Sequence, residues 1–207
     1  MKHLLNYVTL MLLGVVLVFT SCKKEDNPEP EQQSELKTGE VTLRKTEYGN
    51  DWVYFSFPAE DTVTISNHNT SLNWDIAFNR YDNVRTNSGK SGSGKGGTYD
   101  AGEIDFNSIT LANENGYAVD DSIQIVKEIG ARGPIYMNSA GNKTFKGCIL
   151  FSMADYSYTP NNHAYVVKTA DGKYARLLVT DFYNDRGESG YMTFKYAYQP
   201  DGSRKLD

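Results

Sequence analysis

The sequence of 207 residues contains only two cysteines and three histidines. Cys22 belongs to an N-terminal motif described below, which leaves Cys148 without a partner for a disulfide. A lone cysteine also does not build a cysteine-rich metal site. Because Cys148 stands in the apolar segment GCILF, we expect a buried and unreactive thiol. With so few histidines, no Ser-His-Asp arrangement is plausible. We therefore expect a protein that is not an enzyme.

An excess of positive charge is also absent. The chain has 21 Lys and Arg against 26 Asp and Glu, a formal net charge of −5, so it lacks the basic surface typical of nucleic-acid binding. Amphipathic helical patterns longer than three turns are missing as well. Fifteen tyrosines and nine phenylalanines favour strands instead.

The one long apolar run lies at the N-terminus. Val8 to Phe19 is mostly apolar but shorter than the roughly 20 residues that span a bilayer as a helix. A basic start and the ending FTSC favour a signal peptide over residues 1–21, and FTSC resembles a bacterial lipobox with Cys22 as the acylated residue. The competing interpretation is an ordinary signal peptide with an incidental cysteine.

Residues 22–38 are charged and nearly free of apolar side chains, so we expect a flexible tether. Glu25 and Asp26 in it resemble the surface-export signal of Bacteroidetes lipoproteins. We expect a protein anchored by lipid to the outer membrane, exposed at the cell surface, with the membrane contacted only through that anchor. Whether the chain stays attached or is shed by cleavage in the tether is left open.

Residues 39–207 fit one domain of ordinary size. Apolar and aromatic residues alternate along short segments, and Asp171-Gly172 lies between two such segments, which is a strong hairpin signal. The expected strands lie in residues 51–57, 72–78, 163–183 and 191–199. We predict an all-β, antiparallel sandwich with little helix.

A glycine-rich segment, TNSGKSGSGKGGTYD at residues 86–100, contains most of a phosphate-binding G-x-x-x-x-G-K motif. In a functional P-loop, a Ser or Thr follows the lysine and a helix begins there. Here Gly96 and Gly97 follow Lys95, and each glycine disfavours a helix by about 1 kcal/mol. We expect a loop that does not bind nucleotides.

Several segments together resemble the HmuY family, the haem-binding lipoproteins of Bacteroidetes. SLNWDIAFNRYDNVRTNSGKSGSGKGGTYD is similar to the family's L-N-W-D strand and the loop that follows it, and WVYFSF is similar to a preceding strand. VKTADGKYARLLVTDFYND and MTFKYAY are similar to its C-terminal hairpin and last strand. The resemblance covers almost all of residues 40–198 and implies a domain of the HmuY type.

The resemblance also implies haem, iron protoporphyrin IX, held by two axial side chains. The family's ligand segments correspond to GPIYMNSAG and FSMADYS, which carry Met137 and Met153 in place of histidines. By alternation alone, both methionines are also compatible with core packing, and Tyr136 is an alternative oxygen ligand. His68 and His163 match neither ligand position, and Met192 stands among core aromatics.

The implied function is capture of haem from host haemoproteins and transfer to a TonB-dependent outer-membrane receptor. Thioether ligands favour the lower oxidation state of a metal, so we expect tighter binding of ferrous haem. Candidates for an apolar haem slot are Tyr136, Phe145, Tyr156 and Tyr158. The alternatives are a glycan-binding surface lipoprotein that uses Trp52 or Trp74 as a stacking platform, and a HmuY-like fold without haem binding.

Overall fold

The fold is almost entirely built of strands. The computed structural model describes residues 34–207, in which thirteen strands and one short 3-10 helix occur. Their bounds are β1 Lys37–Thr42, β2 Val53–Ser56, β3 Asp61–Val63, β4 Ile76–Asn79, β5 Asn83–Thr86, β6 Gly97–Gly102, η1 Phe106–Ser108, β7 Asp121–Gly130, β8 Gly133–Gly141, β9 Ile149–Phe151, β10 Tyr158–Pro160, β11 Ala164–Lys168, β12 Tyr174–Tyr183 and β13 Ser189–Gln199.

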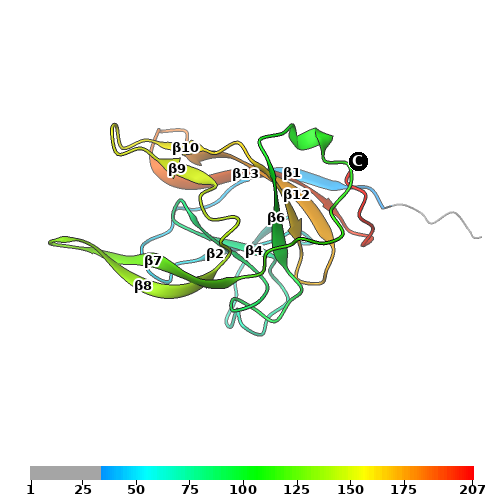
Figure 1. Ribbon diagram of the computed structural model, residues 1–207, viewed down its shortest axis with the longest axis horizontal. Coiled ribbons are helices and arrows are strands. Elements are labelled where there is room, and N and C mark those ends of the chain that lie inside the picture. The colour runs from blue at the N-terminus through cyan, green and yellow to red at the C-terminus, as the bar shows by residue number, and fades with distance from the viewer. Residues whose placement is uncertain (1–33) are drawn as a thin grey trace, which may run out of the picture. The chain divides into compact units, whose positions relative to one another are not determined.

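The larger sheet has five strands in the order β1-β13-β12-β11-β6, and all neighbours are antiparallel (Figure 1). Strands β11 and β12 form the hairpin predicted around Asp171-Gly172, and Gly172 adopts a φ of 94° in its turn. A positive φ is readily available to glycine, which explains the strength of this sequence signal.

The second sheet has the order β3-β2-β4-β5 and faces the first sheet across the main core. The Phe55 ring of β2 lies 5.2 Å from the Phe194 ring and 5.5 Å from the Tyr196 ring of β13. Met192 is buried in the same cluster, as predicted. The antiparallel sandwich expected from the sequence is confirmed.

The alternation in WVYFSF is confirmed, and both of its faces are covered. Phe55 and Phe57 belong to the main core, whereas Trp52 and Tyr54 belong to a second apolar cluster on the other face of β2. This second cluster also receives Ile125 from β7. The second sheet, β3-β2-β4-β5, is therefore the middle layer between the main core and the β7–β8 hairpin.

The strand expected over residues 72–78 is shorter than predicted. Strand β4 begins at Ile76, and Leu72 is 55% exposed. The backbone N–H of Ser71 donates to the Asn67 carbonyl at 3.2 Å, and that of Asn73 to the Ser71 hydroxyl at 3.2 Å. Turn hydrogen bonds therefore replace strand pairing in this segment.

The glycine-rich segment wraps around one side chain, Asn87. Its Nδ2 donates to the Trp74 carbonyl at 2.9 Å, and its Oδ1 accepts from the Gly94 N–H at 3.1 Å. A Cβ at Gly96 would lie 2.8 Å from the Asn87 carbonyl oxygen. The chain then continues into β6 rather than into a helix, so the prediction that this is no P-loop is confirmed.

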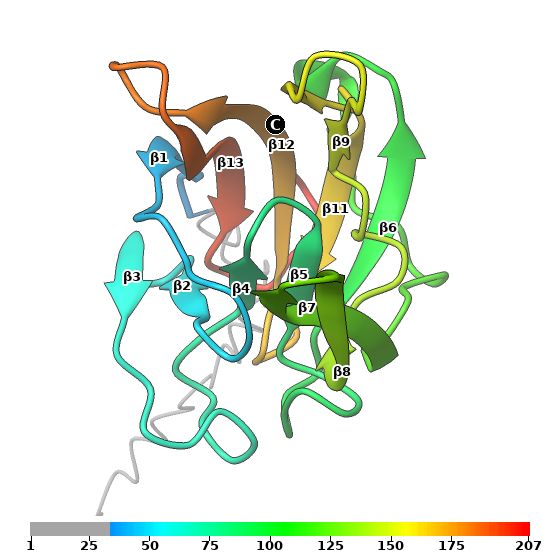
Figure 2. The ribbon, with the colours of Figure 1, turned by 90° about the vertical axis from the view of Figure 1, so that its left-hand side faces the viewer.

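Two hairpins that were not predicted extend on the same side of the domain (Figures 1 and 2). Strands β7 and β8 pair only with each other, as do β9 and β10. Cys148, just before β9, is fully buried, and burial raises its pKa to about 12. It is the inert thiol expected.

Cys22, the signal peptide and most of the tether lie outside the described residues. Strand β1 begins at Lys37, two residues before the expected domain boundary, and residues 34–207 belong to one compact unit. Among residues 34–207, no helix is long and apolar enough to cross a membrane.

Candidate functional site

A cavity of about 200 Å³ lies between the β4–β5 turn and the β7–β8 hairpin. We call it the turn cavity. Its lining includes Arg80 and Tyr81 from the turn, Tyr136 from β8, and Lys146 from the loop before β9. Segments far apart in the sequence therefore meet at the base of the two hairpins.

The β4–β5 turn has an unusual backbone. Arg80 adopts a φ of 56°, a region that non-glycine residues rarely occupy. The neighbouring loop holds it there: the Arg80 N–H donates to the Thr46 hydroxyl at 2.7 Å, and Asn79 Nδ2 donates to the carbonyls of Glu47 at 3.0 Å and Asp51 at 2.8 Å. Such strained positions occur often in binding sites.

Tyr81 connects the turn cavity with the β9–β10 hairpin. Its ring lies 5.2 Å from the Tyr158 ring and 6.0 Å from the Phe151 ring. Burial, followed by the nearby Asp82 carboxylate, raises the pKa of Tyr81 to about 12. The phenol therefore stays neutral at physiological pH. The three rings form a partly buried aromatic cluster, in which Tyr81 and Tyr158 also pack against the main core.

Met153 lies in the turn of the β9–β10 hairpin and is 72% exposed. Tyr156 in the same turn is 71% exposed, and its ring lies 6.2 Å from the Phe151 ring. Since a methionine that packs a core is buried, the core interpretation of Met153 does not hold. Its thioether is accessible to a ligand.

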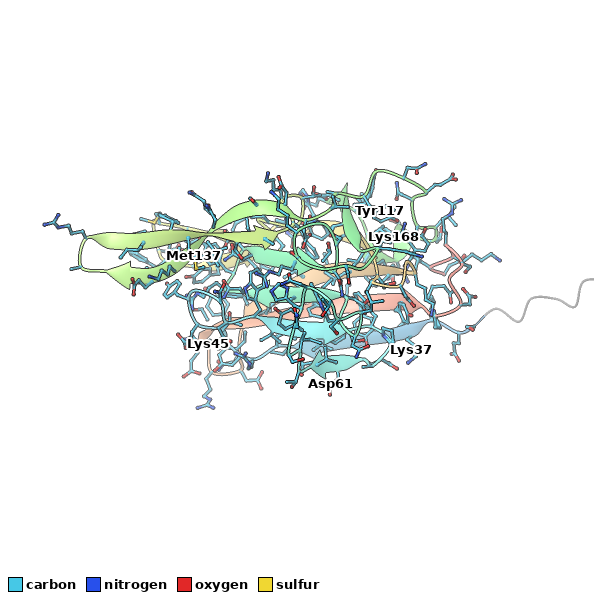
Figure 3. The ribbon with its side chains drawn as sticks, turned by 90° about the horizontal axis from the view of Figure 1, so that it is seen from below. Lys37, Lys45, Asp61, Tyr117, Met137 and Lys168 are labelled. Carbon is cyan, nitrogen blue, oxygen red and sulfur yellow. The ribbon has the colours of Figure 1, made fainter. Side chains whose placement is uncertain are left out.

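Met137 and Tyr136 are neighbours on β8 and have different surroundings. Met137 lies opposite Ile125 in the ladder and packs against the second apolar cluster, and Figure 3 shows it on the β7–β8 hairpin. Tyr136 is 57% exposed and lines the turn cavity. Adjacent strand residues point to opposite faces. Tyr136 therefore faces the turn cavity, and Met137 faces away from it.

Three aromatic residues are not where the sequence hypotheses require them. Phe145 is fully buried, with its ring 4.2 Å from the Tyr165 ring, so it belongs to the main core and not to a haem slot. Trp74 is also fully buried, and Trp52, 6% exposed, is covered by the Arg85 guanidinium at 3.8 Å. Neither tryptophan is available as a platform for a sugar.

Both histidines of the described residues are engaged away from the turn cavity. Nδ1 of His68 lies 2.8 Å from the Ser91 carbonyl oxygen, and Nδ1 of His163 lies 3.0 Å from the Asp100 carboxylate. Within residues 34–207, no cluster of three or more His, Cys, Asp or Glu side chains could hold a metal ion. The residues that the sequence analysis named as candidate iron ligands, Met137, Met153 and Tyr136, lie instead on the two hairpins.

Comparison with known proteins identifies the family. The model of the HmuY protein family matches residues 48–196. The chain belongs to the HmuY family. This confirms the resemblance inferred from the motifs, although no functionally curated protein matches the chain.

Solved structures agree on the fold of this HmuY-family protein. The apo HmuY analogue of Tannerella forsythia is 22% identical, with a TM-score of 0.67 over 82% of this chain and 100% of that one. A candidate HmuY-like haem-binding protein of Bacteroides vulgatus is 27% identical, with a TM-score of 0.62 over 78% of this chain and 92% of that one. Apo PinO from Porphyromonas is 17% identical, with a TM-score of 0.62 over 80% of this chain and 98% of that one.

Sequence reasoning missed Tyr48, Arg80 and Tyr81. Arg80 and Tyr81 stand in FNRYDN, and neither glycine nor proline marks this stretch as a tight turn. The contacts that hold Arg80 come from residues more than 30 positions away. Local patterns therefore contain no signal for this part of the site.

Proposed function

We propose that this protein binds haem beside the turn cavity, between the β7–β8 and β9–β10 hairpins, and acts as a haem carrier rather than an enzyme. The observation that carries the proposal is the exposed Met153 thioether. It shares the turn of the β9–β10 hairpin with the exposed Tyr156, in a chain that belongs to the HmuY family. Exposed apolar groups gathered in one region are typical of a binding surface.

The side chains around the turn cavity suit a porphyrin. Tyr81, at the wall of this cavity, belongs to a partly buried aromatic cluster with Phe151 and Tyr158. A flat apolar macrocycle would pack against the outer edge of this cluster and against the exposed Tyr156. Haem supplies an iron atom with two axial positions, which soft thioether sulfur or a tyrosine oxygen can occupy. The available donors therefore match the chemistry of the cofactor.

The proposed axial ligands are Met153 and Met137. Met137 is only partly buried, at the edge of the second apolar cluster and on the face of β8 opposite Tyr136, so ligation through its sulfur requires the β7–β8 hairpin to twist toward the haem. A pair of thioethers favours ferrous iron, and methionine ligation raises the haem potential. We therefore expect reduced haem to bind more tightly than oxidised haem.

A second candidate for the β8 ligand is Tyr136. It already lines the turn cavity in the conformation described and is more exposed than Met137. A phenolate oxygen favours ferric haem, so the two arrangements predict opposite preferences for the oxidation state. This difference makes them separable by experiment.

We further propose a place for the protein in haem uptake. It would take haem from host haemoproteins at the cell surface and pass it to a TonB-dependent receptor of the outer membrane, to which the lipid on Cys22 keeps it close. A solved structure of similar fold, 22% identical, is described as a candidate lipoprotein of Bacteroides fragilis. Several acyl chains are needed for stable anchoring, which a bacterial lipoprotein provides.

A haem titration of residues 34–207, with and without dithionite, tests the binding proposal. We expect a low-spin ferrous spectrum in the wild type that becomes high-spin in Met153→Ala and in Met137→Ala. Tyr136→Phe should leave this spectrum unchanged. Met192→Leu, which removes a thioether from the core with little change in volume, is the matched control.

Each other outcome has a definite meaning. If Tyr136→Phe changes the spectrum and Met137→Ala does not, Tyr136 is the β8 ligand. If the wild type shows no saturable change in the Soret band in either oxidation state, the protein is not a haem carrier. A HmuY-like domain without haem binding is then the correct description.

A further inference from the structure

We propose that Arg80 is the anion-binding residue of the turn cavity and that it pairs with a carboxylate on the edge of the bound porphyrin. This inference rests on the proposed function, because it names the residue that receives the charged edge of the same ligand. It concerns a residue that contributes nothing to iron ligation and can be tested without iron.

Arg80 is a cation without an acidic partner. Among residues 34–207, no carboxylate lies within ion-pair distance of its guanidinium; the nearest acid in sequence, Asp82, pairs with Lys146 at 2.7 Å. The Nε of Arg80 is buried and has no hydrogen-bond acceptor. Its Nη1 and Nη2 donate to neutral oxygens, the Thr46 carbonyl at 3.3 Å and the Tyr48 hydroxyl at 3.4 Å. An arginine at the wall of a cavity whose charge no carboxylate neutralises is suited to an anionic ligand.

Neighbouring groups hold the guanidinium in place without neutralising it. The guanidinium lies over the Tyr48 ring, 4.3 Å from its centre, and Nη1 donates to the Thr46 carbonyl at 3.3 Å. The guanidinium also interacts with Tyr158. Burial raises the pKa of the Tyr158 phenol, and the positive charge of Arg80 opposes that rise. The charge is thus positioned between the two hairpins before a ligand arrives.

The size of the turn cavity limits what can enter it. At about 200 Å³, it is smaller than the roughly 300–1,000 Å³ typical of sites that enclose a drug-sized ligand. A porphyrin ring cannot be enclosed there, but a propionate side chain can. The planar guanidinium matches a carboxylate with two parallel hydrogen bonds, so the carboxylate edge of the ring would point into the turn cavity.

The test compares metal-free protoporphyrin IX with its dimethyl ester, because neither compound can use axial ligands. Affinities are measured by porphyrin fluorescence for the wild type, Arg80→Gln and Arg80→Lys, each in the same detergent. Arg186→Gln removes the same charge from an exposed turn and is the matched control. Arg80→Asn is a second charge-removing variant, since asparagine tolerates the positive φ of this position.

We expect the wild type and Arg186→Gln to bind the free acid about tenfold more tightly than the ester, the effect of roughly 1.4 kcal/mol from a charge-assisted hydrogen bond. Arg80→Gln and Arg80→Asn should bind the two compounds equally. Arg80→Lys should keep part of the preference, because it retains the charge but loses the planar fork.

Two results would overturn the role of Arg80. One is a wild type that fails to discriminate acid from ester, or that binds haem but not the metal-free acid. The other is a preference that survives in a folded Arg80→Gln or Arg80→Asn, which would assign the carboxylate to another cation such as Lys146. In both cases the haem titration with dithionite still reports separately on the proposed function.

Discussion

At the scale of single residues, the most consequential buried charge is Asp75. It is 3% exposed, and its carboxylate accepts the N–H groups of Phe57 and Ala170, both at 2.9 Å. It thereby ties the end of β2 to the β11–β12 turn, on the other sheet. Burial is the main cause that raises its pKa from 3.8 to about 6, and these two hydrogen bonds oppose the rise.

This pKa predicts how stability changes with pH. Between pH 3.8 and about 6 the folded protein holds a proton on Asp75 that the unfolded chain has released, so the free energy of unfolding falls as pH rises through this range. Lowering the pH from 7.5 to 5 should increase the contribution of Asp75 by roughly 1–2 kcal/mol. Urea unfolding of residues 34–207 at the two pH values measures the change.

Asp75→Asn is the control for that experiment. It cannot titrate, so its unfolding free energy should depend less on pH by the same roughly 1–2 kcal/mol, whatever its absolute stability. Burial also raises the pKa of Asp120, another buried acid. The unfolding free energy of Asp75→Asn should therefore still fall as pH rises, but less steeply than that of the wild type. An unchanged slope in Asp75→Asn would show that its carboxyl group titrates normally.

At the scale of elements, the glycine-rich segment around Asn87 is a packing device. A Cβ at Gly96 would lie 2.8 Å from the Asn87 carbonyl oxygen and 2.9 Å from its nitrogen, and backbone atoms cannot move aside easily. We expect Gly96→Ala to destabilise the protein by about 1–3 kcal/mol, measured by urea unfolding. Ser93→Ala, at an exposed site of the same segment, should stay within about 0.5 kcal/mol of the wild type.

A wild-type-like stability in Gly96→Ala would contradict this interpretation. It would mean that the segment shifts without cost and that the glycines are present for another reason. The segment leads into β6 and not into a helix. Added ATP should therefore leave the unfolding free energy of both the wild type and Gly96→Ala unchanged.

The β7–β8 hairpin can be tested as an element of its own. Its distal part is exposed, with Ile129 58% and Ile135 46% accessible, while Ile123 and Ile125 nearer its base pack on the second apolar cluster. Replacing residues 129–134 with Asn-Gly, a favoured two-residue turn, should change the unfolding free energy by less than about 1 kcal/mol. A larger loss, or loss of a single cooperative transition, would show that the tip supports the core.

Much of the sandwich could be predicted because its strands carry their own signals. The alternating aromatics of residues 192–198 and the Asp171-Gly172 turn depend only on neighbours in sequence, and both predictions are confirmed. The strand predicted over residues 72–78 is wrong in its first half, because turn hydrogen bonds at Ser71 and Asn73 override the apolar alternation there.

The site was only partly predictable. The resemblance to the family pointed to Met137 and Met153, with Tyr136 as an alternative oxygen ligand. Of these three, Met153 and Tyr136 are exposed on the two hairpins. The resemblance could not show that Met137 packs against a cluster formed by Trp52 and Ile125, since that cluster joins strands far apart in sequence. The same reason hid Arg80, whose position depends on contacts between distant loops.

At the scale of the whole molecule, the proposed ligand would join two hairpins that share no strand pairing. A ligand that binds only the folded state stabilises it, by about 2.7 kcal/mol at a free concentration one hundred times the Kd. We expect reduced haem to raise the midpoint of thermal unfolding of the wild type. The increase should be smaller in Met153→Ala.

The comparison must exclude non-specific effects of haem. Met192→Leu, altered in the core, should start from a lower or equal midpoint and show the full increase, because its binding surface is intact. An equal increase in wild type and Met153→Ala would mean that haem binds elsewhere on the molecule.

The arrangement of hairpins on a separate sandwich has a consequence for how such proteins diverge. Met153 and Tyr136 stand on exposed β-ribbons, and the buried aromatics that hold the sheets together lie elsewhere. Substitutions at the proposed site should therefore cost little stability, and substitutions in the core should leave the proposed site intact. Solved structures of similar fold at 17–27% identity show that this architecture tolerates extensive change in sequence.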